Sequence, residues 1–306
     1  MIFDVTSIQD LVRKYSDEQK CIEFLEKAFW NGNPVSPFDA TSKVYKCKNN
    51  RYKCKNTGKY FNVKTGTIFE DSKIPLSDWF IAIWLFTTHK GGISSCELAR
   101  EIHVTQKTAW FVLHRIRESA EFENHADLEN EVEMDETYIG GLNKNRHADK
   151  KIHQSQGRSN KDKIPVFGML ERDCRVVAKV VDSTSAKDLM PHILRTVDVC
   201  ADVFTDEWVA YKNLDKIFNH YTVDHGAGQY VKGKIYTNNM ECFWGNLKRM
   251  IIGVYRKMSK WQLQRYVDEN VFRYNTRKLT PAERFVYLLH HTKGRRLKYK
   301  ELKNAC

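Results

Sequence analysis

Two aspartates stand where a carboxylate is unfavourable unless another charge compensates it. Asp135 lies in the middle of an apolar strand pattern, EVEMDETYIGG, and Asp206 ends a second pattern, DVFTDE. An aspartate inside a strand loses hydration that only a charged partner restores. If the two strands are parallel neighbours, the aspartates lie side by side, and like charges at that distance require a cation between them. Oxygen ligands alone favour Mg²⁺ or Mn²⁺ over zinc.

A third carboxylate, Glu241, stands at the edge of an apolar stripe in the helical pattern TNNMECFWGNLKR. The stripe repeats at helical spacing through Met240, Phe243, Trp244, Leu247, Ile251 and Val254. If this helix packs on the sheet of the two aspartates, Glu241 completes a set of three acids. Two divalent ions about 4 Å apart, bridged by such carboxylates, suit in-line displacement at phosphorus.

Other interpretations of these acids remain open. Glu241 could simply pair with Lys248, which lies seven positions further on the same side of the helix. Local strand phase does not exclude neighbouring acids as the functional ones, namely Glu133, Glu136, Asp202 and Glu207.

The elements around these acids predict an α/β domain over residues 131–258. Three strand patterns joined by short links precede a helix and a fourth strand, and a further helix and fifth strand follow. This order predicts a mixed sheet with helices packed on it. A polar insert, 142–163, carries seven Lys or Arg against two Asp, which fits either a flap that faces nucleic acid or a solvated loop.

The sequence divides the rest of the chain into further regions. Residues 1–34 predict short helices, 35–70 a small β module, 121–130 a polar linker and 259–306 a basic helical region. Between them, residues 71–120 contain two short helical patterns with a tight turn, typical of a helix-turn-helix. Ser94 and Glu97 have capping-box spacing at the first of these helices.

The second of the two helices would present polar and aromatic side chains outward for groove and phosphate contact, namely Gln106, Lys107, Trp110 and His114. An ordinary helical hairpin is the alternative. The net charge of +12 supports a nucleic-acid partner, because residues 245–306 carry 16 Lys or Arg against 4 Asp or Glu. We expect phosphate contacts from this part of the chain, through Lys248, Arg249, Arg256, Lys257, Arg265, Arg273 and Arg277.

Cysteine usage and hydropathy indicate a compartment. The eight cysteines show no CxxC pair, no signal-like start precedes them, and no apolar run approaches the roughly 20 residues of a membrane span. We therefore expect a cytoplasmic protein with reduced thiols and no membrane association.

Several motifs, in one order, closely resemble the DDE-type bacterial transposases of the insertion-sequence 1595 family, also called ISXO2-like. They are VEMDETYIGG, VFTDEW, VDHGAGQYV, YTNNMECFWGNLKR and RYVDENVFRYNTRK, preceded by TGTIFEDSKIPLSDWF and GGISSCELAREIHVTQKTAWFVLHRIR. The resemblance spans residues 35 to 287. It implies a ribonuclease-H-like catalytic domain over 131–258, in which Asp135, Asp206 and Glu241 bind Mg²⁺. His225 and Asn238 match positions near the family's site, although His225 could equally be structural and Asn238 could be a helix N-cap.

The resemblance implies a transposase that cuts DNA at the ends of its element and joins the freed 3′-OH to target DNA, as a homo-oligomer on double-stranded DNA. Alternatives are a catalytically inactive or domesticated DNA-binding regulator, and a nuclease of the same fold. One departure concerns residues 35–70. The family commonly carries two CxxC pairs there, whereas this chain has Ser36-Pro37-Phe38-Asp39 and Cys54-Lys55-Asn56-Thr57. With one thiolate of four, we expect a degenerate ribbon without zinc.

Overall fold

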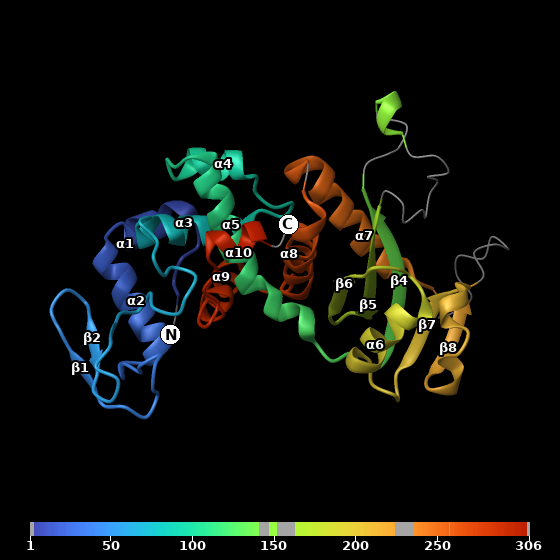
Figure 1. Cartoon of the computed structure of the whole chain (residues 1–306), viewed down its shortest axis with the longest axis horizontal. Helices are drawn as coiled ribbons and strands as arrows, with labels where there is room; N and C mark the ends of the chain where they lie inside the picture. Colours follow the sequence, from blue (N-terminus) through green and yellow to red (C-terminus); the bar gives the residue numbers. More distant parts are fainter. Residues whose placement is uncertain (1–2, 141–146, 152–162, 224–235, 257, 305–306) are drawn as a thin grey trace. The chain divides into compact units, whose positions relative to one another are not determined.

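The computed structural model describes residues 3–140, 147–151, 163–223, 236–256 and 258–304 (Figure 1). The chain forms two compact units. The first contains residues 1–120 together with 278–306, and the second contains residues 121–277.

The second unit contains a five-stranded mixed sheet in the order β6-β5-β4-β7-β8 (Figure 1). Three strands, β4 (Glu131–Ile139), β5 (Ile164–Glu171) and β6 (Val176–Val180), are antiparallel neighbours. β7 (Asp202–Asp206) then runs parallel to β4, and β8 (Asn219–Val223) runs parallel to β7. The predicted mixed sheet is confirmed, and it is compatible with a ribonuclease-H-like fold. Its first and fourth strands are parallel neighbours, which was the condition for placing the two aspartates side by side.

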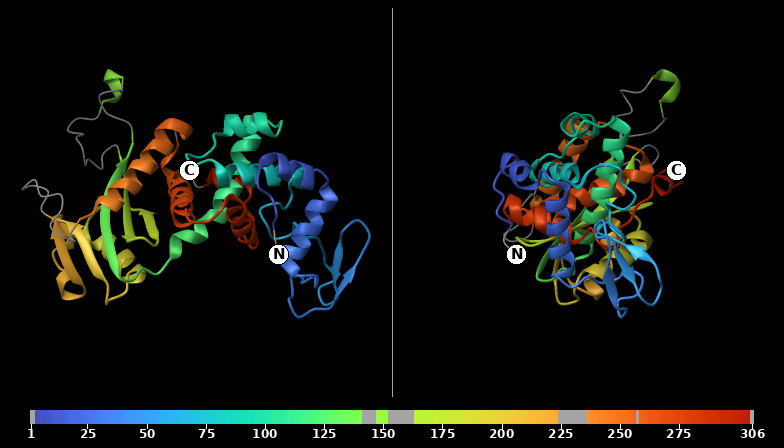
Figure 2. Two further views of the ribbon diagram at one scale, coloured as in Figure 1. Left: turned by 180° about the vertical axis from the view of Figure 1, so that it is seen from behind. Right: turned by 90° about the vertical axis from the view of Figure 1, so that its left-hand side faces the viewer.

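Helices cover the two faces of this sheet because its central strands are apolar on both sides. On one face, α6 (Ala186–Thr196) packs through Leu189 and Ile193 onto Val132 and Met134. On the other face lie α7 (Asn238–Met250) and α8 (Leu263–Asn275), seen from two further directions in Figure 2. The predicted apolar stripe of α7 is buried here through Met240, Phe243, Trp244 and Leu247.

The first unit is mostly helical. Its helices are α1 (Ile8–Tyr15), α2 (Glu18–Trp30), α3 (Leu76–Thr88), α4 (Ser95–Glu101), α5 (Gln106–Ala120), α9 (Pro281–His290) and α10 (Tyr299–Asn304). An antiparallel sheet of β1 (Val44–Lys46), β2 (Tyr52–Cys54) and β3 (Tyr60–Phe61) forms the predicted β module. None of the helices within the described ranges combines the length and the apolar character that crossing a bilayer requires.

Two predicted regions are organised differently in the structure. The expected linker 121–130 packs into the second unit, where Asn124 is fully buried and bonded to the backbone of Ala178, and Leu128 joins the core. The expected C-terminal region 259–306 is divided between the two units. Apolar residues of α8 complete the core over α7, whereas Phe285 of α9 stacks on Phe3 at 4.6 Å in the first unit.

Candidate active site

Asp135 and Asp206 lie on adjacent parallel strands and on the same face of the sheet. The register pairs Glu133 of β4 with Phe204 of β7, and each aspartate comes two residues after its member of that pair. Burial, together with the negative charges of Asp206 and Glu241, raises the pKa of Asp135 to about 7. Asp206 is also buried, and its Oδ1 accepts a hydrogen bond from the backbone N–H of Trp208 at 3.0 Å. The fold therefore brings the predicted aspartates together.

Glu241 lies in the first turn of α7, on the face of the sheet that carries the aspartates. Its side chain is exposed, and its charge acts on Asp135. Lys248 is exposed as well. Both residues lie in the described part of the chain, and no ion pair joins them there. The simple alternative for Glu241, a surface pair with Lys248, is therefore absent from the structure.

A tryptophan that the sequence placed only in the apolar stripe turns out to touch the site. Trp244 is buried in α7, and its Nε1 donates to Oδ2 of Asp135 at 3.1 Å. A buried indole N–H needs a hydrogen-bond acceptor, so the position of Trp244 in the apolar stripe could have indicated a polar partner on the sheet. The helix comes close enough because Gly168 of β5 lies opposite Asp135, and a Cβ at Gly168 would stand 2.4 Å from Met240 and 2.6 Å from Trp244.

The neighbouring acids that the sequence left open have other surroundings. Glu133 is fully buried and accepts hydrogen bonds from Arg172 and from the start of α7. Glu136 points to the opposite face of the sheet, where its carboxylate accepts a hydrogen bond from the hydroxyl group of Tyr211. Asp202 begins β7, four residues before Asp206, and Glu207 is exposed after the strand ends.

The donor set of the three acids fits a hard divalent cation. All the offered atoms are carboxylate oxygens, and the mutual repulsion that raises the pKa of Asp135 would be relieved by a positive ion. Within the described ranges, no three Asp, Glu, His or Cys side chains are already gathered closely enough to surround a metal ion. The two aspartates thus form the pre-arranged part of the site, and Glu241 is the exposed third member.

Comparison with known proteins places this site in a family. Residues 127–275, which include all three acids, match the family model of the ISXO2-like transposase domain. Residues 127–275 form an ISXO2-like transposase domain. The chain is 28% identical over 270 residues to an uncharacterized protein in transposable element ISH50 of Halobacterium salinarum, covering 84% of this chain and 90% of that protein. It is also 27% identical over 103 residues to an uncharacterized transposase-like protein of Haemophilus influenzae, covering 33% of this chain and 82% of the relative.

Two further residues of the transposase domain were predicted near its site. Asn238 is exposed and is the first residue of α7, so the interpretation of Asn238 as N-cap is wrong: Thr237 is the N-cap residue. His225 lies outside the residues that the structure describes.

Among the basic residues expected to touch DNA in the transposase domain, Lys248, Arg249 and Arg256 are exposed. Lys257 lies outside the described residues. Arg265 is half-buried. The expectation for Arg273 is wrong, because its guanidinium is buried against Glu269 at 2.7 Å. Arg277 is half-buried, and its guanidinium donates to the carbonyl oxygens of Cys174 and Tyr274.

The helical pair that precedes the transposase domain was also predicted to bind DNA. Gln106 and Lys107 are exposed at the start of α5, and Trp110 is half-buried. The prediction that His114 faces outward is wrong, since it is fully buried with its ring 4.2 Å from that of Trp110. Residues 112–117 of α5 are all buried, and Arg115 among them donates to the carbonyl oxygens of Ile68, Glu70 and Leu297.

The ribbon-like module also brings its expected ligand positions together, but with hydroxyl groups in place of thiols. Cys54 is fully buried. Burial opposes ionisation of its thiol, but hydrogen bonds with Ser36, Ser42 and Thr57 outweigh that effect and lower the pKa of Cys54 to about 6. Asp39 accepts hydrogen bonds from Thr41 and Asn56.

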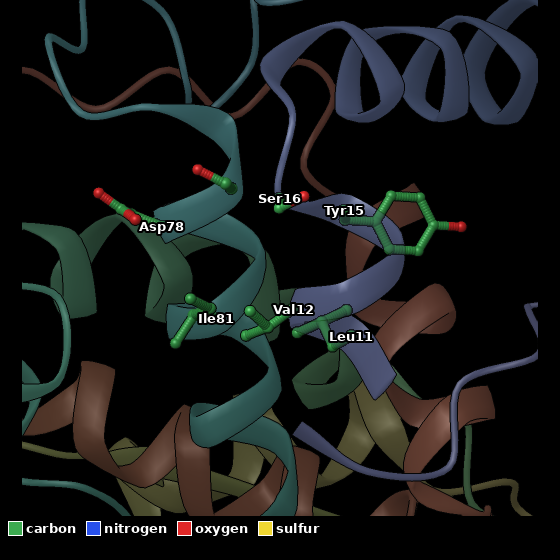
Figure 3. A pocket seen from close by; sticks show the side chains of 7 residues that line it. Leu11, Val12, Tyr15, Ser16, Asp78 and Ile81 are labelled. Carbon is green, nitrogen blue, oxygen red and sulfur yellow. The ribbon is translucent and has the colours of Figure 1, made fainter. Parts of the chain in front are cut away.

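Two pockets in the first unit are lined by residues other than the three acids. Figure 3 shows one of about 200 Å³ between α1 and α3, where Leu11, Val12 and Ile81 supply apolar walls and Asp78 the acidic group. Another, of about 530 Å³, is lined by Phe3 and residues of α9.

Proposed function

We propose that this insertion-sequence transposase cuts DNA at the ends of its element and transfers the freed 3′ end to target DNA. The proposal is carried by the placement of Asp135 and Asp206 on parallel neighbouring strands, with Glu241 on the helix above them. Hydrolysis and strand transfer are both in-line displacements at phosphorus, so one site can serve both steps.

Side chains of the protein hold and orient this site rather than attack the DNA. Asp135, Asp206 and Glu241 would hold Mg²⁺ or Mn²⁺, which would activate the attacking oxygen and stabilise the leaving oxygen. Trp244 donates its indole N–H to Oδ2 of Asp135 and so orients this carboxyl group. Because burial raises the pKa of Asp135 to about 7, a proton would compete with the metal ion for this carboxyl below neutral pH.

Exposed cations beside the site would hold the substrate. Lys248 and Arg249 lie in the last turn of α7, the helix that carries Glu241 in its first turn, and Arg256 follows on the next segment. We propose that these side chains contact backbone phosphates, and that Gln106 and Lys107 of α5 contact the terminal inverted repeats. Joining two ends calls for at least two copies of the chain on the DNA.

A strand-transfer assay tests the proposal. Labelled element-end DNA, a plasmid target and Mg²⁺ are incubated with wild-type protein and with Asp135→Asn and Glu241→Gln. Asp202→Asn is the matched control, because it neutralises an aspartate earlier on the same strand as Asp206. We expect joined products from wild type and from Asp202→Asn, and none from the two site variants.

Each other outcome selects a different function. Nicked ends without joined products would indicate a nuclease of the same fold. Equal DNA binding by all four proteins without any cleavage would indicate a DNA-binding regulator, and both enzymatic functions would be rejected. The oligomeric state on DNA follows from the mass of the complex in the same buffer.

A further inference from the structure

Glu133 is a buried carboxylate that the proposed chemistry does not use. It stands on β4 two residues before Asp135 and on the same face, and none of its surface is exposed. Its Oε2 accepts the backbone N–H groups of Asn239 at 3.0 Å and Met240 at 3.1 Å. Its Oε1 accepts Nε of Arg172 at 2.8 Å and the side-chain amide of Asn239 at 2.9 Å. Burying a charge without such partners would be costly, so these four bonds define one arrangement.

Arg172 connects this carboxylate to several elements. It follows β5, and its guanidinium also donates to Glu131 of β4 at 3.0 Å and to the carbonyl oxygen of Tyr236 at 2.9 Å. The guanidinium lies over the rings of Phe204 of β7, at 4.2 Å, and Tyr236, at 3.8 Å. A planar cation that is hydrogen-bonded at its edge and stacked on its faces has little freedom to move.

The N-terminus of α7 has no local side-chain cap. The hydroxyl of Thr237, at the N-cap position, makes no capping hydrogen bond. Elsewhere in the chain Ser94 caps α4 and Thr280 caps α9 from within the helix's own sequence. In α7 that task falls to Glu133, which lies 106 residues before Asn239 in the sequence. The carboxylate also lies at the positive end of the helix dipole, which favours its charge.

We propose that Glu133 and Arg172 are positioning residues, which fix the first turn of α7 against β4 and thereby set Glu241 relative to Asp135. This inference rests on the proposed function of the three acids. A local cap would stabilise the helix but leave it free to shift on the sheet. A cap supplied by β4 instead holds the helix start at a fixed place, two residues along the strand from Asp135, and the Trp244 contact fixes the next turn.

Mn²⁺ binding to the DNA-free protein tests this inference, with electron paramagnetic resonance of free Mn²⁺ as the readout. We compare wild type with Glu133→Gln, which keeps the shape of the side chain and removes its charge. Groups that orient metal ligands typically contribute 10- to 100-fold to metal affinity. We expect Glu133→Gln to raise the half-saturating Mn²⁺ concentration by roughly that factor.

The matched control is Glu269→Gln. Glu269 is equally buried and pairs with Arg273, and the exposed side-chain fractions are 0% and 8% in both ion pairs. Both variants lose a buried ionic partner, but Glu269 does not cap α7. We expect the control to change Mn²⁺ affinity less than about threefold. Should Glu133→Gln fail to fold, Asn239→Ala removes one of the four hydrogen bonds and is expected to weaken Mn²⁺ binding several-fold.

Asp135→Asn separates the positioning role from the metal site itself. If Asp135→Asn abolishes Mn²⁺ binding while Glu133→Gln behaves like Glu269→Gln, the positioning role is refuted and the metal site stands. If Asp135→Asn binds Mn²⁺ like wild type, the proposed metal site is refuted, and the positioning role is refuted with it.

Discussion

Replacing Gly168 with alanine tests how closely α7 must approach the sheet. The new methyl carbon would lie 2.4 Å from Cε of Met240 and 2.6 and 2.8 Å from two ring carbons of Trp244. Carbon atoms in contact are ordinarily about 3.5–4.0 Å apart, so α7 would have to move away by about 1 Å. Neither neighbour can simply turn aside, since both are buried.

The displacement has a predictable cost for both stability and activity. Overpacking of this kind typically destabilises a protein by about 1–3 kcal/mol. For a unit of this size, that corresponds to a loss of roughly 2–12 °C in Tm. A shift of about 1 Å in a positioned group can reduce a reaction rate by about 100-fold. We therefore expect Gly168→Ala to lose far more cleavage activity than its fraction of folded protein explains.

Calorimetry and the cleavage assay, run on the same preparations, measure the two effects. The control is Gly245→Ala, within α7 itself, where the added methyl would meet only the flexible tip of Arg249 at 3.3 Å. Alanine is favoured over glycine inside a helix by about 1 kcal/mol, so this variant should be neutral or stabilised. Wild-type Tm and wild-type rate in Gly168→Ala would refute the close packing of Trp244 over β5.

The remaining predictions concern charge, a buried hydroxyl and the ribbon. The pKa of Asp135 is about 7 in the folded protein, because burial raises it from the ordinary value of 3.8. Without divalent ions, the contribution of its bound proton to folding stability is therefore complete below about pH 4 and is lost as the pH rises to about 7. Thermal melts should therefore show Asp135→Asn gaining stability relative to wild type between pH 5 and pH 8, and a constant difference would contradict the assignment. Lys248→Ala should lower the slope of log affinity for DNA against log salt by about 1, and an unchanged slope would argue against a phosphate contact. Tyr211→Phe removes the buried donor to Glu136 and should cost about 1–3 kcal/mol in urea unfolding, which an unaltered midpoint would disprove. Elemental analysis should find no stoichiometric zinc in the purified protein, and one tightly bound zinc per chain would overturn the account of the module around Cys54.

The sequence was most informative where one residue conflicts with its own local pattern. Asp135 inside an apolar strand and Asp206 at the end of another suggested a shared explanation, and the structure supplies the strand pairing that this explanation needed. Glu133 shows the limit of this reasoning. It has the same strand phase as Asp135, and only donors from distant parts of the chain, Arg172 and the first amides of α7, distinguish the two.

Errors arose for the same reason, because burial depends on segments remote in sequence. The helical spacing of apolar residues in α5 correctly predicted which side of the helix is buried, including Ala109 and Leu113. It could not show that His114 is buried as well, beside the ring of Trp110, or that Arg115 donates to the carbonyl oxygens of Ile68 and Leu297. The error for Arg273 has a different and local cause: this residue was interpreted by its charge alone, although its partner Glu269 lies only one helical turn earlier.

The remote cap of α7 also has a consequence for how the protein folds. A helix of 13 residues is marginally stable alone, and this one gains its cap only when β4, made more than 100 residues earlier, is in place. Closing so long a loop is slow compared with forming local contacts, so the start of α7 should order late. A nascent or partly folded chain would then carry all three acids without assembling them, and the candidate site would form only once α7 has docked on β4.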